Sequence, residues 1–144
     1  MLRRTVVCVT AMTLVMAFAG IAQGQDKLQN YFSGTASKVK ATADPTEKRE
    51  ILNKSFEKMS KALTSVQSSP LVSKDDKAGI DRIKVVLAEK RDELEGRNGF
   101  DRVPDLQLNA FASYVVQDME QATQTVTLSL ISLLLIILIV ALLL

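Results

Sequence analysis

The 19 residues Val126–Leu144 contain no charged side chain, and most of them are leucine, isoleucine or valine. At about 1.5 Å per residue, a helix of this length extends roughly 28 Å, close to the bilayer's hydrocarbon thickness of about 30 Å. A small domain cannot bury a segment that is apolar on every face. We therefore expect residues 126–144 to form a transmembrane helix, with membrane lipid as their partner.

A second apolar segment lies near the N-terminus. Arg3 and Arg4 precede an apolar stretch of roughly 12 residues, and the small-residue pattern Ala22-Gln23-Gly24 follows it. This order predicts a signal peptide over residues 1–24, cleaved after Gly24. The alternative is an uncleaved membrane anchor over Thr5–Ala22, although transmembrane helices contain about 20 residues.

Together these segments predict a single-pass protein of the cell membrane. The signal peptide directs residues 25–125 across the membrane, so this domain is expected on the extracytoplasmic side, periplasmic or extracellular. In a eukaryotic source, the C-terminal run has an alternative interpretation as a signal for a glycosylphosphatidylinositol (GPI) anchor on a surface protein. The cut would fall near Val116–Asp118, where valines and Met119 are poor substitutes for the small residues required.

Charge and residue types exclude several classes of function. Residues 25–144 hold 16 basic and 16 acidic residues, because two of the 18 basic residues are Arg3 and Arg4. This balance argues against electrostatic binding of nucleic acid or of anionic lipid. The sequence has no histidine, and its one cysteine is Cys8, which excludes imidazole metal sites and histidine-based catalysis. We expect no catalytic residues, no metal and no cofactor, and therefore a protein that is not an enzyme.

Between the two apolar segments, apolar residues recur at helical spacing. The first run covers residues 28–43. The second begins at Asp44, a suitable N-cap, with Pro45 and Glu47 suited to the first helical turn. It breaks at Ser68-Ser69-Pro70.

Two further runs complete the pattern. The third begins with a capping box of Ser73 and Asp76 and ends before Gly96, which suits the position after a helix. The fourth begins near Pro104 and keeps its register into the apolar run, which predicts one helix over Pro104–Leu144, about 60 Å long. The alternative is a break near Gln121–Thr127, where β-branched residues weaken a helix. The predicted fold is all-α: a small up-down bundle of three to four helices with a C-terminal transmembrane helix.

The third run carries a cluster of acidic residues, which are Glu89, Asp92, Glu93 and Glu95. Paired carboxylates on one helix face can bind Ca²⁺ or perform acid/base chemistry. Basic residues are interleaved with them, however, and no loop rich in oxygen ligands is present. We therefore interpret the cluster as a solvated helix face.

The second run carries three lysines on one side, Lys54, Lys58 and Lys61, a pattern that can contact an anionic lipid surface. Glu47, Glu50 and Glu57 dilute this charge, so we interpret the lysines as part of a solvated helix face. Two short motifs overlap them. Ser55-Phe56-Glu57-Lys58 matches the bare pattern of a serine nucleophile with a lysine base, and Asn53-Lys54-Ser55 is a formal N-glycosylation site. Both motifs lie inside an amphipathic helix, so we interpret them as chance matches.

Three side chains suit either the core or a partner. Phe100, in the distinctive loop Asn98-Gly99-Phe100-Asp101, is expected to close one end of the core, with an exposed partner anchor as the alternative. Tyr114 and Met119 in the fourth run fit either role.

These observations predict a non-enzymatic membrane-anchored protein whose small helical bundle acts as a tether or interaction module. Its partner would be another protein or a second copy of the chain. The alternative is an accessory subunit of a larger membrane protein complex.

Overall fold

The structure is a computed structural model that describes residues 28–126 and 128–143. These residues form helices and no strand: an N-terminal helix over residues 28–41, α2 (Pro45–Gln67), α3 (Lys74–Glu95), the 3₁₀ turn η1 (Asp105–Gln107), α4 (Leu108–Gln124) and α5 (Leu130–Leu143). The prediction of an all-α bundle is confirmed. The predicted signal peptide, residues 1–24, lies outside the described residues.

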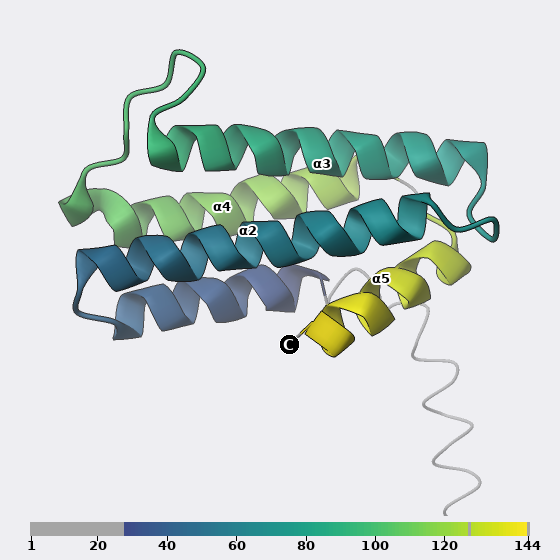
Figure 1. Ribbon diagram of the computed structural model, residues 1–144, viewed down its shortest axis with the longest axis horizontal. Coiled ribbons are helices and arrows are strands. Elements are labelled where there is room, and N and C mark those ends of the chain that lie inside the picture. Colours follow the sequence, from purple (N-terminus) through teal and green to yellow (C-terminus); the bar gives the residue numbers. More distant parts are fainter. Residues whose placement is uncertain (1–27, 127, 144) are drawn as a thin grey trace, which may run out of the picture.

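Four helices run alternately in opposite directions along the long axis of the molecule (Figure 1). They are the N-terminal helix, α2, α3 and α4. α2 packs against α3, and α4 packs against both. After α4 the chain turns, and α5 packs beside α2.

Local signals fix the ends of the two longest helices, as the sequence predicts. The Asp44 carboxylate accepts the Thr46 N–H at 2.9 Å and caps α2. The Ser73 hydroxyl accepts the Asp76 N–H at 3.2 Å and caps α3. α3 ends at Gly96, whose φ of 71° lies in the left-handed region that favours glycine.

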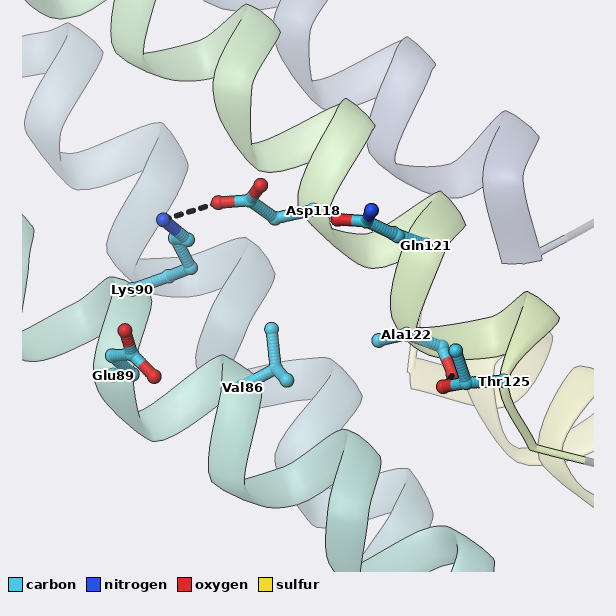
Figure 2. A pocket seen from close by; sticks show the side chains of 7 residues that line it. All are labelled: Val86, Glu89, Lys90, Asp118, Gln121, Ala122 and Thr125. Atoms are coloured by element: carbon cyan, nitrogen blue, oxygen red, sulfur yellow. Dashed lines mark hydrogen bonds and ion pairs between the residues drawn. The ribbon is translucent and has the colours of Figure 1, made fainter.

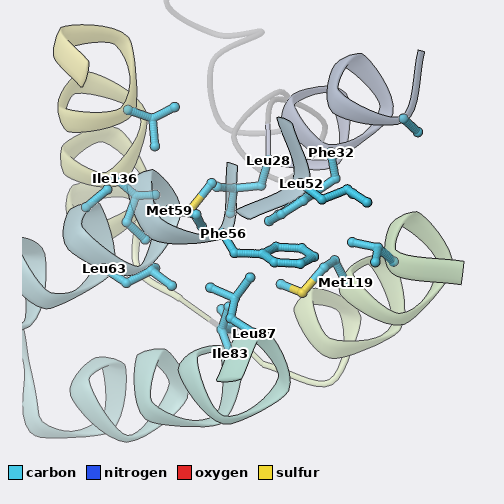
Figure 3. Close-up of a cluster of buried hydrophobic side chains, with 14 of the residues drawn as sticks. Leu28, Phe32, Leu52, Phe56, Met59, Leu63, Ile83, Leu87, Met119 and Ile136 are labelled. Carbon is cyan, nitrogen blue, oxygen red and sulfur yellow. The ribbon is translucent and has the colours of Figure 1, made fainter. Parts of the chain in front are cut away.

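One face of α2 lies at the centre of the core (Figure 3). Its residues Leu52, Phe56, Met59 and Leu63 are at most 1% exposed. Side chains from every other long helix surround them, namely Leu28, Phe32, Ile83, Leu87, Met119 and Ile136 (Figure 3). Burial of a large apolar side chain contributes about 1.5–3 kcal/mol, so apolar contact is the main force that holds the bundle together.

The prediction of one continuous helix over Pro104–Leu144 is wrong. α4 ends at Gln124, α5 begins at Leu130, and the chain turns between them. Val126 in this connection is 4% exposed and packs so closely on α3 that a Cβ on Gly79 would lie 2.5 Å from its Cγ1. Tertiary contacts with α3 thus replace the helical path, and the break lies close to the alternative position, Gln121–Thr127.

α5 belongs to the packed structure. Its residues Leu133, Ile136 and Val140 are buried in the core cluster. None of the helices in the described part of the chain has both the length and the apolar character that a bilayer crossing requires.

Substitution of Gly79 tests the packing of α3 on the connection. Gly79→Ala and Gly34→Ala gain similar helix propensity, but only the first meets a neighbour, since the space around Gly34 is open. The variant at Gly79 should therefore be less stable than the variant at Gly34 by about 1–3 kcal/mol, the usual cost of overpacking. Urea unfolding followed by circular dichroism measures both. Equal stability would contradict the close approach of Val126.

Candidate functional site

The most extensive polar cluster joins α3 to the start of α5. Asp76 of α3 is only 5% exposed. Its two carboxylate oxygens each accept the Ser129 N–H at 3.2 Å, and one of them also accepts the Ser129 hydroxyl and, at 2.7 Å, the Ser132 hydroxyl. We call Asp76, Ser129 and Ser132 the Asp76 clamp. A carboxylate at a helix N-terminus pairs with free N–H groups and complements the helix dipole, so the clamp fixes the start of α5 on α3.

The Asp76 carboxylate is charged at neutral pH. Burial alone would raise its pKa, but the hydrogen bonds from Ser129 and Ser132 outweigh this effect and hold the pKa below its ordinary value of 3.8. One hydrogen bond of the expected capping box is present, since the Ser73 hydroxyl accepts the Asp76 N–H. The Asp76 carboxylate accepts hydrogen bonds at the start of α5.

α5 has one covered face and one uncovered face. On the uncovered face, four large apolar side chains are 51–77% exposed, namely Ile131, Leu134, Leu138 and Leu142. We call these four residues the outer stripe. Exposed apolar patches of this kind mark contact with another protein or with a membrane.

The acidic residues of α3 are used separately. Asp92, Glu93 and Glu95 accept hydrogen bonds from three different partners, which are Asn98, Lys90 and Asn53 respectively. Within the described ranges, no group of three or more acidic, cysteine or histidine side chains is arranged to hold a metal ion.

Lys90 lies in a cleft of about 390 Å³ between α3 and α4 (Figure 2). Its ammonium forms ion pairs with Asp118 of α4 and, at 2.8 Å, with Glu93. Burial alone would lower the pKa of Lys90, but these two carboxylates outweigh burial and raise it. A protonated ammonium has no lone pair for a nucleophile or a general base, so Lys90 serves to link the two helices.

The lysines of α2 are not equivalent. Lys54 pairs with Glu50 at 2.7 Å and Lys61 with Glu57 at 2.8 Å, each one helical turn away. Lys58 forms no ion pair with the residues that the structure describes. The carboxylates of Glu50 and Glu57 thus offset the charges of Lys54 and Lys61, although such exposed pairs contribute little stability.

The Ser55 hydroxyl takes part in helix packing. It is buried and forms a hydrogen bond of 2.7 Å with the Thr35 hydroxyl of the N-terminal helix. Asn53, in the same turn, is half-buried and donates to Glu95 at 2.7 Å. These contacts agree with the interpretation of both motifs as chance matches.

The prediction that Phe100 closes the end of the core is wrong, since Phe100 is exposed. Val103 packs against the core instead. The reason is Arg49, whose guanidinium donates to the carbonyls of Leu94 and Val103 and pairs with Asp105 at 2.6 Å. These bonds hold the end of the loop against the bundle and leave its tip in solvent.

Of the two side chains of α4 for which the sequence left core or partner open, Met119 lies in the core and Tyr114 does not. Met119 is buried in the core, whereas Tyr114 on the same helix is 60% exposed.

Comparison of the chain with protein-family models, curated proteins and solved structures found no match.

Replacement of Asp76 tests the clamp. Asp76→Asn removes the charge at the start of α5 and exchanges one acceptor oxygen for a donor. We expect the free energy of unfolding to fall by about 1–3 kcal/mol at pH 7, the cost of an unsatisfied buried hydrogen-bonding group. Asp75→Asn is the matched control, because Asp75 is adjacent and exposed. Urea unfolding measures both variants, and equal losses would contradict the clamp.

The same variant has a predicted pH dependence. Because the folded pKa of Asp76 lies below its ordinary value of 3.8, its contribution is complete at neutral pH and is lost as the pH falls through the folded pKa. The stability difference between wild type and Asp76→Asn should therefore shrink in acid. A difference that stays constant from pH 7 into the acid range would show that ionisation of Asp76 is irrelevant.

Proposed function

We propose that this protein is a non-enzymatic, single-pass membrane protein. Residues 126–144 hold the helical bundle, residues 25–125, on the extracytoplasmic side of the cell membrane. The observation that carries the proposal is the outer stripe of α5, a row of large exposed apolar side chains on a helix without charge. Contact with lipid would remove this apolar surface from water, which is favourable in proportion to its area.

Anchoring requires α5 to change its length. We call α5 docked when it packs on the bundle as in the structure. The docked α5 has 14 residues and so extends about 21 Å, whereas residues 126–144 as one helix would extend roughly 28 Å. Only the second length approaches the hydrocarbon thickness of about 30 Å. In the proposal, residues 126–129 join the helix on insertion, so Val126 leaves α3 and Ser129 leaves Asp76.

Docked and inserted forms are then two positions of one segment. In water, the docked form is favoured by the Asp76 clamp and by burial of Leu133, Ile136 and Val140. In a membrane, lipid covers both faces of the segment. A ligand or solvent shifts such an equilibrium only through its different affinity for the two forms, and lipid supplies that difference here.

The role of the anchor is to concentrate the bundle at the membrane surface. A tether raises the effective concentration of the bundle for a protein partner or a second copy of the chain. An accessory subunit of a larger complex would instead use one face of residues 126–144 for protein contacts. Exchange of leucine and isoleucine positions within the segment separates the two, because only a tether tolerates it.

Charge introduced into the outer stripe tests the proposal. Leu134→Asp combined with Leu138→Asp places two carboxylates in the membrane segment, at a cost of about 2.5–3.5 kcal/mol each. We expect wild type to stay with membranes during an alkaline carbonate wash and the double variant to be released. The docked fold should survive in the variant, since both positions are exposed, and circular dichroism checks this.

The matched control is Val85→Asp with Leu106→Asp, two exposed apolar residues outside α5. It adds the same charge and should stay with the membrane. Protease added to intact cells should digest residues 25–125 if this domain lies outside. Release of wild type as a free monomer by carbonate would overturn the proposal.

A further inference from the structure

Two neighbouring cavities share part of their lining, and α5 borders the second of them. The first, about 340 Å³, lies between the N-terminal helix and α2 and is bordered by Lys38, Lys54 and Lys58. We call it the basic cavity. The second, about 290 Å³, lies between the N-terminal helix, α2 and α5. Tyr31 and Asn30 line both cavities, so the two are adjacent.

The basic cavity favours an anion. None of the described residues that line either cavity is acidic. Lys54 is shared with Glu50, but neither Lys38 nor Lys58 forms an ion pair with the residues that the structure describes. Lysine ammonium groups bind carboxylate and phosphate by charge-assisted hydrogen bonds. Lys38 and Lys58, with Lys54 beside them, therefore suit a single anionic group.

The floor of the basic cavity is neutral and already fixed. The Tyr31 hydroxyl donates to the Ser55 carbonyl at 2.8 Å, and the hydroxyls of Thr35 and Ser55 bond to each other at 2.7 Å. Burial raises the pKa of Tyr31, so its phenol stays uncharged and does not repel an anion. Ligand specificity must then come from the lysines.

The second cavity is lined almost entirely by apolar side chains, and we call it the apolar crevice. Leu28 and Met59 form one side, and Ile137, Val140 and Ala141 of α5 form the other. Figure 3 shows Leu28 and Met59 side by side, facing the end of the core where α5 packs. The crevice offers nothing to a charged group and suits a hydrocarbon chain.

We propose that the basic cavity and the apolar crevice together bind one single-chain anionic amphiphile, such as a lysophospholipid. Its anionic headgroup sits among Lys38, Lys54 and Lys58. Its acyl chain passes Tyr31 and enters the apolar crevice against α5. Small-molecule sites usually have volumes of about 300–1,000 Å³, a range that the two cavities reach together.

Such a ligand favours the docked form of α5, because the docked helix supplies one wall of the crevice. Binding to one of two forms stabilises that form by mass action. The amphiphile would thus oppose insertion of residues 126–144 into the membrane. This consequence rests on the proposed membrane function, whereas the binding itself does not.

Native mass spectrometry of the full-length protein in detergent-free buffer tests the binding, because a micelle would compete for α5 as a bilayer does in the proposal. The probe is lysophosphatidylglycerol, with lysophosphatidylcholine as the amphiphile without net charge and inorganic phosphate as the anion without a chain. We expect one equivalent of lysophosphatidylglycerol to be retained, with at least tenfold weaker retention of the other two.

Two variants and one control test the two halves of the site separately. Lys38→Gln with Lys58→Gln should weaken binding about ten- to thirtyfold, given the usual worth of a lysine near an anionic lipid. Lys40→Gln with Lys74→Gln changes the net charge equally at exposed positions that line neither cavity, and should bind like wild type. Ala141→Phe fills the crevice and should weaken lysophosphatidylglycerol without affecting any weak binding of phosphate.

Three outcomes would overturn the site: equal retention of lysophosphatidylcholine, equal retention of inorganic phosphate, or equal weakening by both lysine pairs.

The carbonate wash of the Lys38→Gln and Lys58→Gln variant separates this inference from the proposed function. Loss of amphiphile binding with wild-type membrane recovery is expected. If wild type fails to bind the amphiphile but stays with the membrane, the amphiphile site is overturned and the proposed membrane anchor is not.

Discussion

Burial of apolar surface against one face of α2 is the interaction on which the rest of the structure depends, and α5 takes part in it. α5 packs Leu133, Ile136 and Val140 into the core formed by α2. At about 1.5–3 kcal/mol for each buried side chain, these three contribute an amount comparable with the whole net stability of a small domain, about 5–15 kcal/mol. The bundle thus holds one face of α5, while the outer stripe stays exposed.

Apolar packing alone does not determine where α5 begins. A helix of leucines and isoleucines can slide or rotate on an apolar groove with little loss of contact, whereas hydrogen bonds to a buried carboxylate are directional. The Asp76 clamp supplies that direction by bonding to Ser129 and Ser132 at the first turn of α5. Gly79, one helical turn further along α3, lets Val126 approach closely. Together they turn the chain between α4 and α5.

Helices and their caps could be predicted because their signals are local. The caps at Asp44 and Ser73 and the end of α3 at Gly96 each depend on a few consecutive residues. In the Asp76 clamp, Ser129 and Ser132 follow Asp76 by 53 and 56 positions in the sequence. No residue near Asp76 in the sequence indicates that these serines are its partners. Gly79 did carry a signal, since glycine inside a helical pattern often marks a close contact. The prediction that Phe100 closes the core failed because Arg49, far away in the sequence on α2, holds the end of the loop.

The apolar run over residues 126–144 indicates that its side chains need an apolar environment, but not which partner supplies it. Its composition demands an apolar environment, but lipid and a protein core both provide one. The docked α5 satisfies that demand on one face with protein contacts, and its polar start is satisfied by Asp76 rather than by water. Insertion would exchange both sets of contacts at once: Ser129 and Ser132 would turn their hydroxyls back to carbonyls of the preceding helical turn, and the Asp76 carboxylate would return to water. Under the proposed function, loss of the clamp and gain of lipid contact would therefore be parts of one exchange, in which the bundle and the bilayer would compete for the same helix.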